Sequence, residues 1–131
     1  MKTINPEELG VPKGYSNGAL MPPGSKLLFV AGQIGWTSDQ EIVSEGFLEQ
    51  FDQALRNVLA VVQEAGGQVV HLGRLTIYVT DKNEYLADLH GLGEIYRRIM
   101  GRHFPAMTLV EVQALLEPGA KVEIEATAAI P

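Results

Sequence analysis

Cysteine is absent from the 131-residue chain. This absence excludes disulfides, thiolate metal ligands and cysteine nucleophiles. Small secreted domains often depend on disulfides, so this chain must be stabilised by packing alone or by packing together with oligomerisation. With 46% hydrophobic and 20% charged residues, the composition is typical of a globular protein and indicates a single domain over residues 1–131.

Long apolar segments are absent as well. No apolar run approaches the length that a membrane-spanning helix needs. Residues 1–6 include a lysine but lack the apolar stretch that follows the basic residues of a signal peptide. We therefore expect a cytoplasmic protein without a membrane partner.

Positive charge is scarce. Ten lysines and arginines stand against sixteen aspartates and glutamates, and the formal net charge is −6. Because nucleic-acid binding draws its affinity from neutralised phosphates, we expect no nucleic-acid partner. The one concentration of basic residues comprises Arg97, Arg98, Arg102 and His103. It is either a solvated helix end or an anion site, and the attraction of cations to helix C-termini favours the first.

The common catalytic and metal-binding motifs are missing. The GQIG segment follows an apolar run but lacks the third glycine of a phosphate-binding loop. His71, His90 and His103 lack the spacing of a zinc site, which favours surface or capping roles and no metal. Glu123 and Glu125 point the same way from one strand-like segment, and are either an acid–base pair or part of a solvated strand face.

Residue periodicity predicts an α+β fold with the order β-β-β-α-β-α-β-β. Strands are expected over residues 2–5, 16–21, 26–34, 75–81, 107–115 and 121–130, and helices over 44–65 and 83–100. Each helix carries an apolar stripe, formed by Phe47, Phe51, Leu55, Val58 and Val62 in the first and by Tyr85, Leu89, Leu92, Tyr96 and Ile99 in the second. The run over 26–34 is typical of a central strand buried on both faces, and Glu117-Pro118-Gly119 indicates a hairpin-like turn.

Two helices cover only one face of such a sheet. The alternation in the last strand places Glu123, Glu125 and Thr127 opposite an apolar set. In the strand before it, Met107 and Leu109 alternate with Thr108 and Val110. We expect the helices to cover the apolar face, and Met107 to lie with the carboxylates on the other. A mixed face of this kind suits a subunit interface with polar pockets better than open water.

Three segments together resemble the Rid (YjgF-type) reactive-intermediate deaminase family. The C-terminal signature of that family is similar to FPAMTLVEV at 104–112, followed by PGA at 118–120 and VEIEA at 122–126. Gly14-Tyr15-Ser16 resembles its Pro-Tyr-Ser, and FVAGQI at 29–34 resembles its apolar strand ending in Ser-Gly-Gln-Ile. The resemblance spans nearly the whole chain.

The resemblance implies a chorismate-mutase-like fold, with two helices packed on one face of a mixed sheet. It also implies a homotrimer whose sheets line a central barrel, with a cleft between each pair of neighbouring subunits. Well-studied members hydrolyse small enamines and imines derived from amino acids, releasing ammonia and a 2-oxo acid. They use neither a metal nor an organic cofactor.

Carried over by motif, the catalytic residues are Tyr15 and Glu123, while Gly32 and Thr108 contribute contacts to the same cleft. Trp36 is a further candidate, as a surface on which a ligand stacks. The family arginine that grips the substrate carboxylate corresponds to Met107. A thioether supplies neither the charge nor the paired donors of a guanidinium.

We therefore expect altered substrate preference, with neutral or weakly polar imines as substrates. Arg98 or Arg102 of a neighbouring subunit is a possible source of the missing charge. The alternative is a non-catalytic trimer that binds a small metabolite or a partner protein. The older family labels, translation inhibitor and endoribonuclease, are least favoured because of the net charge of −6.

Overall fold

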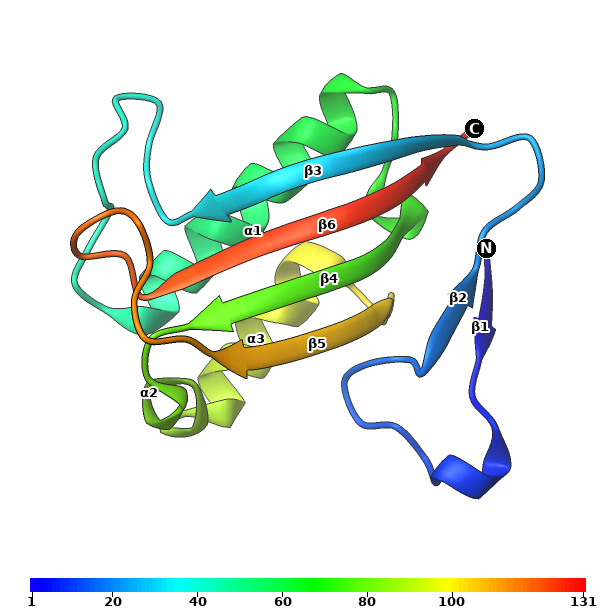
Figure 1. Ribbon diagram of the computed structural model, residues 1–131, viewed down its shortest axis with the longest axis horizontal. Coiled ribbons are helices and arrows are strands. Elements are labelled where there is room, and N and C mark those ends of the chain that lie inside the picture. Colours follow the sequence, from blue (N-terminus) through cyan, green and yellow to red (C-terminus); the bar gives the residue numbers. More distant parts are fainter.

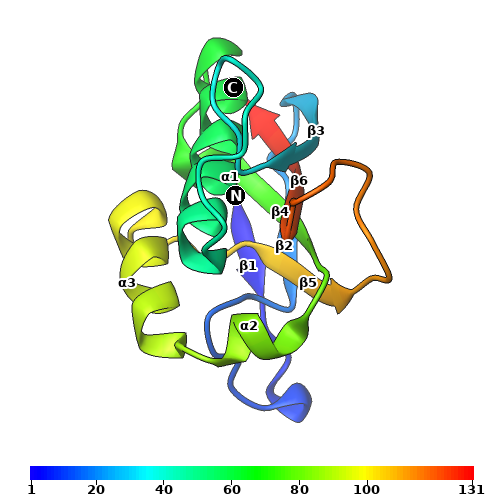
Figure 2. The same ribbon diagram turned by 90° about the vertical axis from the view of Figure 1, so that its left-hand side faces the viewer.

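The computed structural model describes residues 1–131 as a mixed four-stranded sheet with its α-helices on one face (Figures 1 and 2). The sheet order is β3 (Lys26–Ile34), β6 (Val122–Ile130), β4 (Leu72–Val79) and β5 (Ala106–Glu111). The helical layer consists of α1 (Phe47–Glu64), α2 (Lys82–Leu86) and α3 (Leu89–Met100). The sheet is open in the single chain, and the predicted α+β class is confirmed.

The N-terminal segment stands beside this sheet as a small unit of its own (Figure 1). Strands β1 (Lys2–Ile4) and β2 (Gly18–Leu20) pair antiparallel, and a short 3-10 helix at Glu7–Leu9 lies between them. Ser16 anchors this segment to the main sheet, because its Oγ donates to the Phe104 carbonyl at 2.6 Å. The loop over residues 10–17 is thereby held near the start of β5.

Strands β4 and β5 run parallel, and β6 lies antiparallel to β4 on the other side. The sequence suggested that Glu117-Pro118-Gly119 closes a hairpin between β5 and β6. This prediction was wrong, because β4 lies between these two strands. Parallel strands need a long crossover, which α2 and α3 supply. The position of β6 between β3 and β4 is a long-range pairing that the turn residues do not encode.

Strand β3 is an edge strand, so the prediction of a central strand buried on both faces was wrong. Val30 faces the helices and is 3% exposed, whereas Phe29 on the other face is 76% exposed. Leu27 is exposed on that same face. The apolar run at 26–34 arises because both faces of β3 carry apolar residues, but within the chain only the face toward the helices is covered.

The second predicted helix is two helices. Helix α2 ends at Leu86, and α3 begins at Leu89 after Asp88. The Asp88 carboxylate accepts a hydrogen bond from the Gly91 amide at 2.8 Å, which caps α3 and separates it from α2. No helix has the length and hydropathy of a bilayer-spanning segment.

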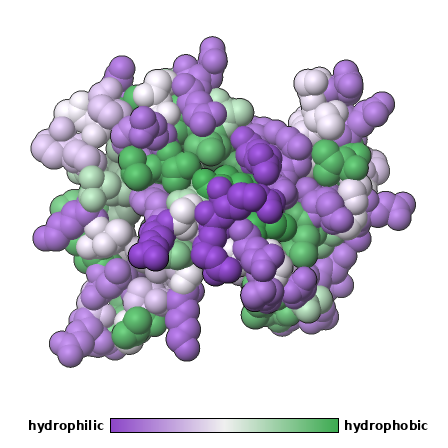
Figure 3. Space-filling model, turned by 180° about the vertical axis from the view of Figure 1, so that it is seen from behind, coloured by the Kyte–Doolittle hydropathy of each residue, from purple (hydrophilic) through white to green (hydrophobic).

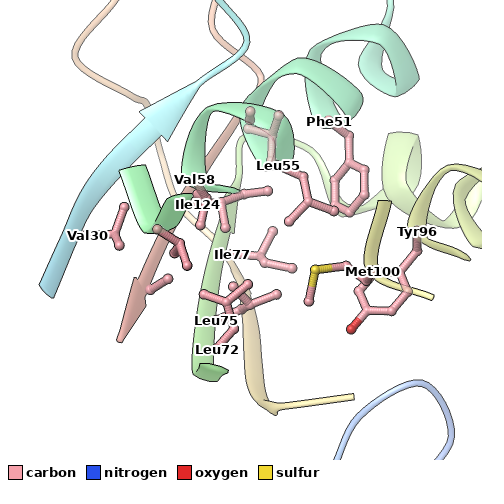
Figure 4. Packing of buried hydrophobic residues seen from close by; sticks show 14 of the residues in the cluster. Val30, Phe51, Leu55, Val58, Leu72, Leu75, Ile77, Tyr96, Met100 and Ile124 are labelled. Carbon is pink, nitrogen blue, oxygen red and sulfur yellow. The ribbon is translucent and has the colours of Figure 1, made fainter. Parts of the chain in front are cut away.

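The core lies between the sheet and α1, with α3 closing one side (Figure 4). All five residues of the predicted α1 stripe are buried, as expected. They pack on the inward residues of the central strands, among them Leu75, Ile77 and Ile124 (Figure 4). Viewed from the helix-covered side, the surface is mostly hydrophilic, with apolar residues visible between the polar ones (Figure 3).

Tyr96 of α3 is held in this core by its ring and by its hydroxyl. Its ring stacks on Phe104 with centroids 5.6 Å apart, and its hydroxyl donates to the His103 carbonyl at 2.7 Å. Burial raises the pKa of the Tyr96 hydroxyl well above the usual 10.0. The folded state therefore binds this proton more tightly than the unfolded state does.

We expect the Tyr96 proton to make stability fall at alkaline pH. Its contribution is complete below the ordinary pKa of 10.0 and decreases as the pH rises above that value, because only the unfolded state then releases the proton. At neutral pH, Tyr96→Phe is expected to lower the free energy of unfolding by about 1 kcal/mol, through the lost hydrogen bond. Above pH 10.0, the variant should lose less additional stability than the wild type, because it has no phenol proton to release. Urea unfolding of both proteins on either side of that pH measures this, and equal alkaline losses would contradict it.

Candidate functional site

Met107 lies on the helix-facing side of the sheet. In the parallel pairing it stands beside Leu75, and Leu109 stands beside Ile77. Leu75 and Ile77 belong to the core, and both Met107 and Leu109 pack against it. The expectation that Met107 shares the face of the carboxylates Glu123 and Glu125 was therefore wrong.

Glu111 explains why the face of Met107 was assigned wrongly. It follows Met107 and Leu109 on the same face of β5, and its carboxylate suggested that this face was the polar one. Its Oε1 accepts a hydrogen bond from the Lys82 amide at 2.9 Å, at the start of α2. A carboxylate at the beginning of a helix is stabilising, so this acidic residue belongs to the helical layer. The alternation along β5 was predicted correctly, but it was assigned to the opposite face.

Two cavities of about 380 and 360 Å³ share Met107 and Tyr85 in their walls. The first lies between α3 and the edge of β5, and the second adds Tyr15 and Leu109. The larger one is lined mainly by apolar and aromatic side chains: Phe51, Ile77, Tyr85, Leu89, Leu92, Tyr96, Phe104 and Met107. The structure thus brings the predicted site residues Tyr15 and Met107 together at one edge of the sheet.

Two cations line the larger cavity, Lys13 of the N-terminal loop and Arg97 of α3. Sequence reasoning missed Lys13. It placed Arg97 only in the basic cluster at the helix end, and it named Arg98 and Arg102 as replacements for the missing arginine. Arg98 is engaged elsewhere in the chain, because its Nη2 pairs with Asp52 at 2.8 Å. Helical spacing distinguishes Arg97 from Arg98 in the sequence, because Arg97 follows Gly93 by one turn and so lies on the same side of α3.

A second group of predicted residues lies on the open face of the sheet, around Glu123. Glu123 is half-buried on β6, beside Tyr78 of β4. A Cβ added at Gly32 would lie 2.8 Å from the Glu123 Cδ, so the carboxylate packs directly over this glycine. The pairing of β3 with β6 is irregular between Val30 and Gln33, where Gly32 lies.

Tyr78 also contacts the second carboxylate of this face. Its hydroxyl donates to Glu125 Oε1 at 2.7 Å, and this hydrogen bond raises the pKa of the Tyr78 hydroxyl above its usual value. Glu123 and Glu125 therefore face the same way, as predicted, and they differ in environment. Glu125 is engaged by Tyr78, while the Glu123 carboxylate rests on Gly32.

The remaining two candidates are Thr108 and Trp36. Thr108 is exposed on the open face, where it lines a cavity of about 580 Å³ with Phe29 and Arg74; Met107 reaches this cavity from the strand edge. Trp36 lies in the loop after β3, where its carbonyl accepts from Asn57 Nδ2 at 3.0 Å. No group of three or more His, Asp or Glu side chains is placed to hold a metal ion.

Comparison with known proteins places this geometry in a family. A family model described as endoribonuclease L-PSP matches residues 7–130. The human 2-iminobutanoate/2-iminopropanoate deaminase is 32% identical over 87% of this chain and 78% of its own. A RutC family protein of Aquifex aeolicus is 34% identical over 98% of both chains. A solved structure of the conserved Rid protein family, YyfB from Yersinia pestis, is 31% identical and superposes with a TM-score of 0.83 over 98% of both chains.

The chain belongs to the Rid family. A further solved structure, Escherichia coli TdcF with bound serine, is 30% identical and has a TM-score of 0.69 over 93% of this chain and 92% of its own. The same sheet and helices therefore recur in Rid proteins. The Rid fold of this chain carries its candidate residues in two groups, one around Met107 and one around Glu123.

Proposed function

We propose that this Rid protein is an enamine/imine deaminase-like hydrolase with a substrate preference altered by Met107. The observation that carries the proposal is the Glu123 carboxylate, which is half-buried and packed over Gly32 on a face that offers it no cation within salt-bridge distance. A relative named as a 2-iminobutanoate/2-iminopropanoate deaminase, 32% identical, supports the reaction class.

In this reaction water adds to the carbon of a C=N bond. Glu123 takes a proton from the water as the C–O bond forms and delivers it to the nitrogen, which gives a carbinolamine. It then takes the remaining hydroxyl proton as the C=O bond forms and delivers it to the nitrogen, which leaves as ammonia when the C–N bond breaks. Every atom comes from substrate and water, so the chain's own side chains suffice. Tyr15, which lines a cavity together with Met107, would orient the imine.

We further propose that the site forms between subunits of a homotrimer. Tyr15 and Met107 lie at the edge of β5, whereas Glu123 and Gly32 lie on the open face, with β4 between β5 and β6. The two groups come together when the β5 edge of one copy lies against the open face of the next. The exposed Phe29 and Leu27 supply apolar surface for that contact.

A non-catalytic binding protein is the second candidate. It is favoured by the mainly apolar lining of the larger cavity at Met107. The nuclease reaction named by the family description is not proposed, because the net charge of −6 opposes the binding of a polyanion.

Ammonia release from a panel of imines generated in situ tests the proposal. Glu123→Gln is expected to lower turnover by about two orders of magnitude or more, the contribution of a positioned acid–base group. Gly32→Ala is expected to lower turnover as well, because its Cβ displaces the Glu123 carboxylate, a flexible group that can move without unfolding the sheet.

Glu125→Gln is the matched control on the same strand. Its amide oxygen still accepts the Tyr78 hydrogen bond, so we expect near-normal turnover. Full activity of Glu123→Gln would contradict the assigned base. A wild-type protein that binds ligands tightly but releases no ammonia from any imine would establish the binding protein instead.

A further inference from the structure

The larger cavity at Met107 has the size and lining of a small-molecule pocket. Its volume of about 380 Å³ lies within the ~300–1,000 Å³ typical of such sites. The buried side chains of Phe51, Ile77 and Leu92 form its floor, and the stacked rings of Tyr96 and Phe104 border it.

Gly93 opens the helical wall of this cavity. A Cβ built at Gly93 would meet a single side-chain atom, Arg97 Nη1, at 3.6 Å. The Arg97 guanidinium therefore lies over Gly93, one turn earlier on α3. A larger residue at 93 would enter the cavity and displace the guanidinium.

Arg97 and Lys13 have no carboxylate partner, as is also true of Lys82 and Arg102, but only Arg97 and Lys13 among the cations line the larger cavity. Asp52 engages both Arg56 and Arg98, and Lys121 pairs with Glu84. Neither Arg97 nor Lys13 takes part in an ion pair. In a chain with net charge −6, two unpaired cations on the same apolar cavity favour an anionic group at its mouth.

Tyr85 supplies the third polar group of the cavity. Its ring is held edge-on against Phe47 at a centroid distance of 6.4 Å, and its hydroxyl makes no hydrogen bond within the chain. Burial raises the pKa of this hydroxyl, which remains a donor at neutral pH. A rigid donor without a protein partner, in the wall of both cavities at Met107, is available to a ligand.

We propose that this cavity binds a small carboxylate with an apolar body larger than an ethyl group, with the body beneath α3 and the carboxylate held by Arg97 and Lys13. The inference extends the proposed function, since such a ligand would be a substrate or product of the same site. Arg97 and Lys13 would then take over the charge that Met107 lacks, from another part of the fold.

Binding of three probes, measured by calorimetry, tests the two halves of the cavity separately. 4-Methyl-2-oxopentanoate has both groups, pyruvate has the carboxylate without the body, and 4-methylpentan-2-one has the body without the carboxylate. We expect pyruvate to bind about fiftyfold more weakly than 4-methyl-2-oxopentanoate, from three unburied carbon groups. The neutral ketone is expected to bind at least about tenfold more weakly than 4-methyl-2-oxopentanoate, because the charge-assisted hydrogen bonds of the carboxylate are lost.

Variants then place the ligand. Arg97→Gln and Lys13→Gln are each expected to weaken 4-methyl-2-oxopentanoate binding about fivefold to tenfold, as partly exposed charge-assisted contacts. Gly93→Leu is expected to abolish it by filling the cavity. Lys82→Gln changes an exposed cation that lines none of the cavities at Met107, so it is the matched control and should bind normally.

The inference is overturned if the wild type binds none of the probes, or if binding survives both Gly93→Leu and the Arg97→Gln/Lys13→Gln double variant. The double variant keeps the test valid should Gly93→Leu not fold. Glu123→Gln separates this inference from the proposed function, because it should retain probe binding while losing ammonia release. Binding without turnover in the wild type would reject the hydrolase and leave the pocket established.

Discussion

Replacing Gln50 by leucine is expected to lower the free energy of unfolding by about 3–5 kcal/mol, although leucine is the more hydrophobic residue. Gln50 is fully buried in α1. Its Nε2 donates to the carbonyls of Ser44 at 2.9 Å and of Gly119 at 3.0 Å, and its Oε1 accepts from the Lys121 amide at 2.8 Å. Leucine would leave all three backbone groups without this partner at a partly buried place.

Urea unfolding followed by circular dichroism measures this loss, at one protein concentration because association would shift the apparent stability. Gln53→Leu is the matched control. Gln53 lies on the same helix, is only partly buried and bonds just to the Asn57 side chain, at 2.8 Å, so a change of less than about 1 kcal/mol is expected. A comparably small loss in Gln50→Leu would show that the three backbone groups find other partners.

Gln50 also connects stability to the site. It ties α1 to the loop that leads into β6, and Lys121 stands two residues before Glu123. One clue to this role is visible in the sequence, because Gln50 falls between Phe47 and Ala54 on the buried side of the helix. A polar residue on an apolar stripe predicts a buried hydrogen-bond network, but its partners, Ser44 and Gly119, are far apart in sequence.

Local pattern predicted most of the secondary structure and the α+β class. The α1 stripe is buried as expected, and the last strand alternates as expected between core residues and Glu123 or Glu125. These features depend on residues within one helix or one strand, where a fixed period relates the position of a residue to the side on which its side chain lies.

Long-range pairing explains what the sequence did not predict. Which face of β5 the helices cover depends on its register with β4, and a period of two residues does not specify that face. The position of β3 at the sheet edge depends on β6 pairing between β3 and β4. The cations Arg97 and Lys13 lie on one cavity because the N-terminal loop is held near β5, a contact between segments about eighty residues apart.

Met107→Arg is expected to reduce the preference of the site for substrates with a larger apolar body. If the cavity holds the apolar body of the ligand, an arginine at 107 fills part of that space and offers a bidentate partner for a carboxylate at the cavity mouth. We expect the ratio of kcat/KM for 2-iminopropanoate to that for 4-methyl-2-iminopentanoate to rise by about tenfold, because the new charge pair serves the carboxylate of both substrates and only the lost part of the apolar pocket distinguishes them.

Met107→Leu is the control, because it keeps the volume and the lack of charge and should leave the ratio near that of the wild type. The arginine also adds a third cation beside Arg97 and Lys13. We therefore expect Met107→Arg to lower the melting temperature, and the added Arg97→Gln change to restore part of it while keeping the new preference. An unchanged ratio in Met107→Arg would mean that this side chain does not face the bound substrate, and the specificity would then have to be set by the open face around Glu123.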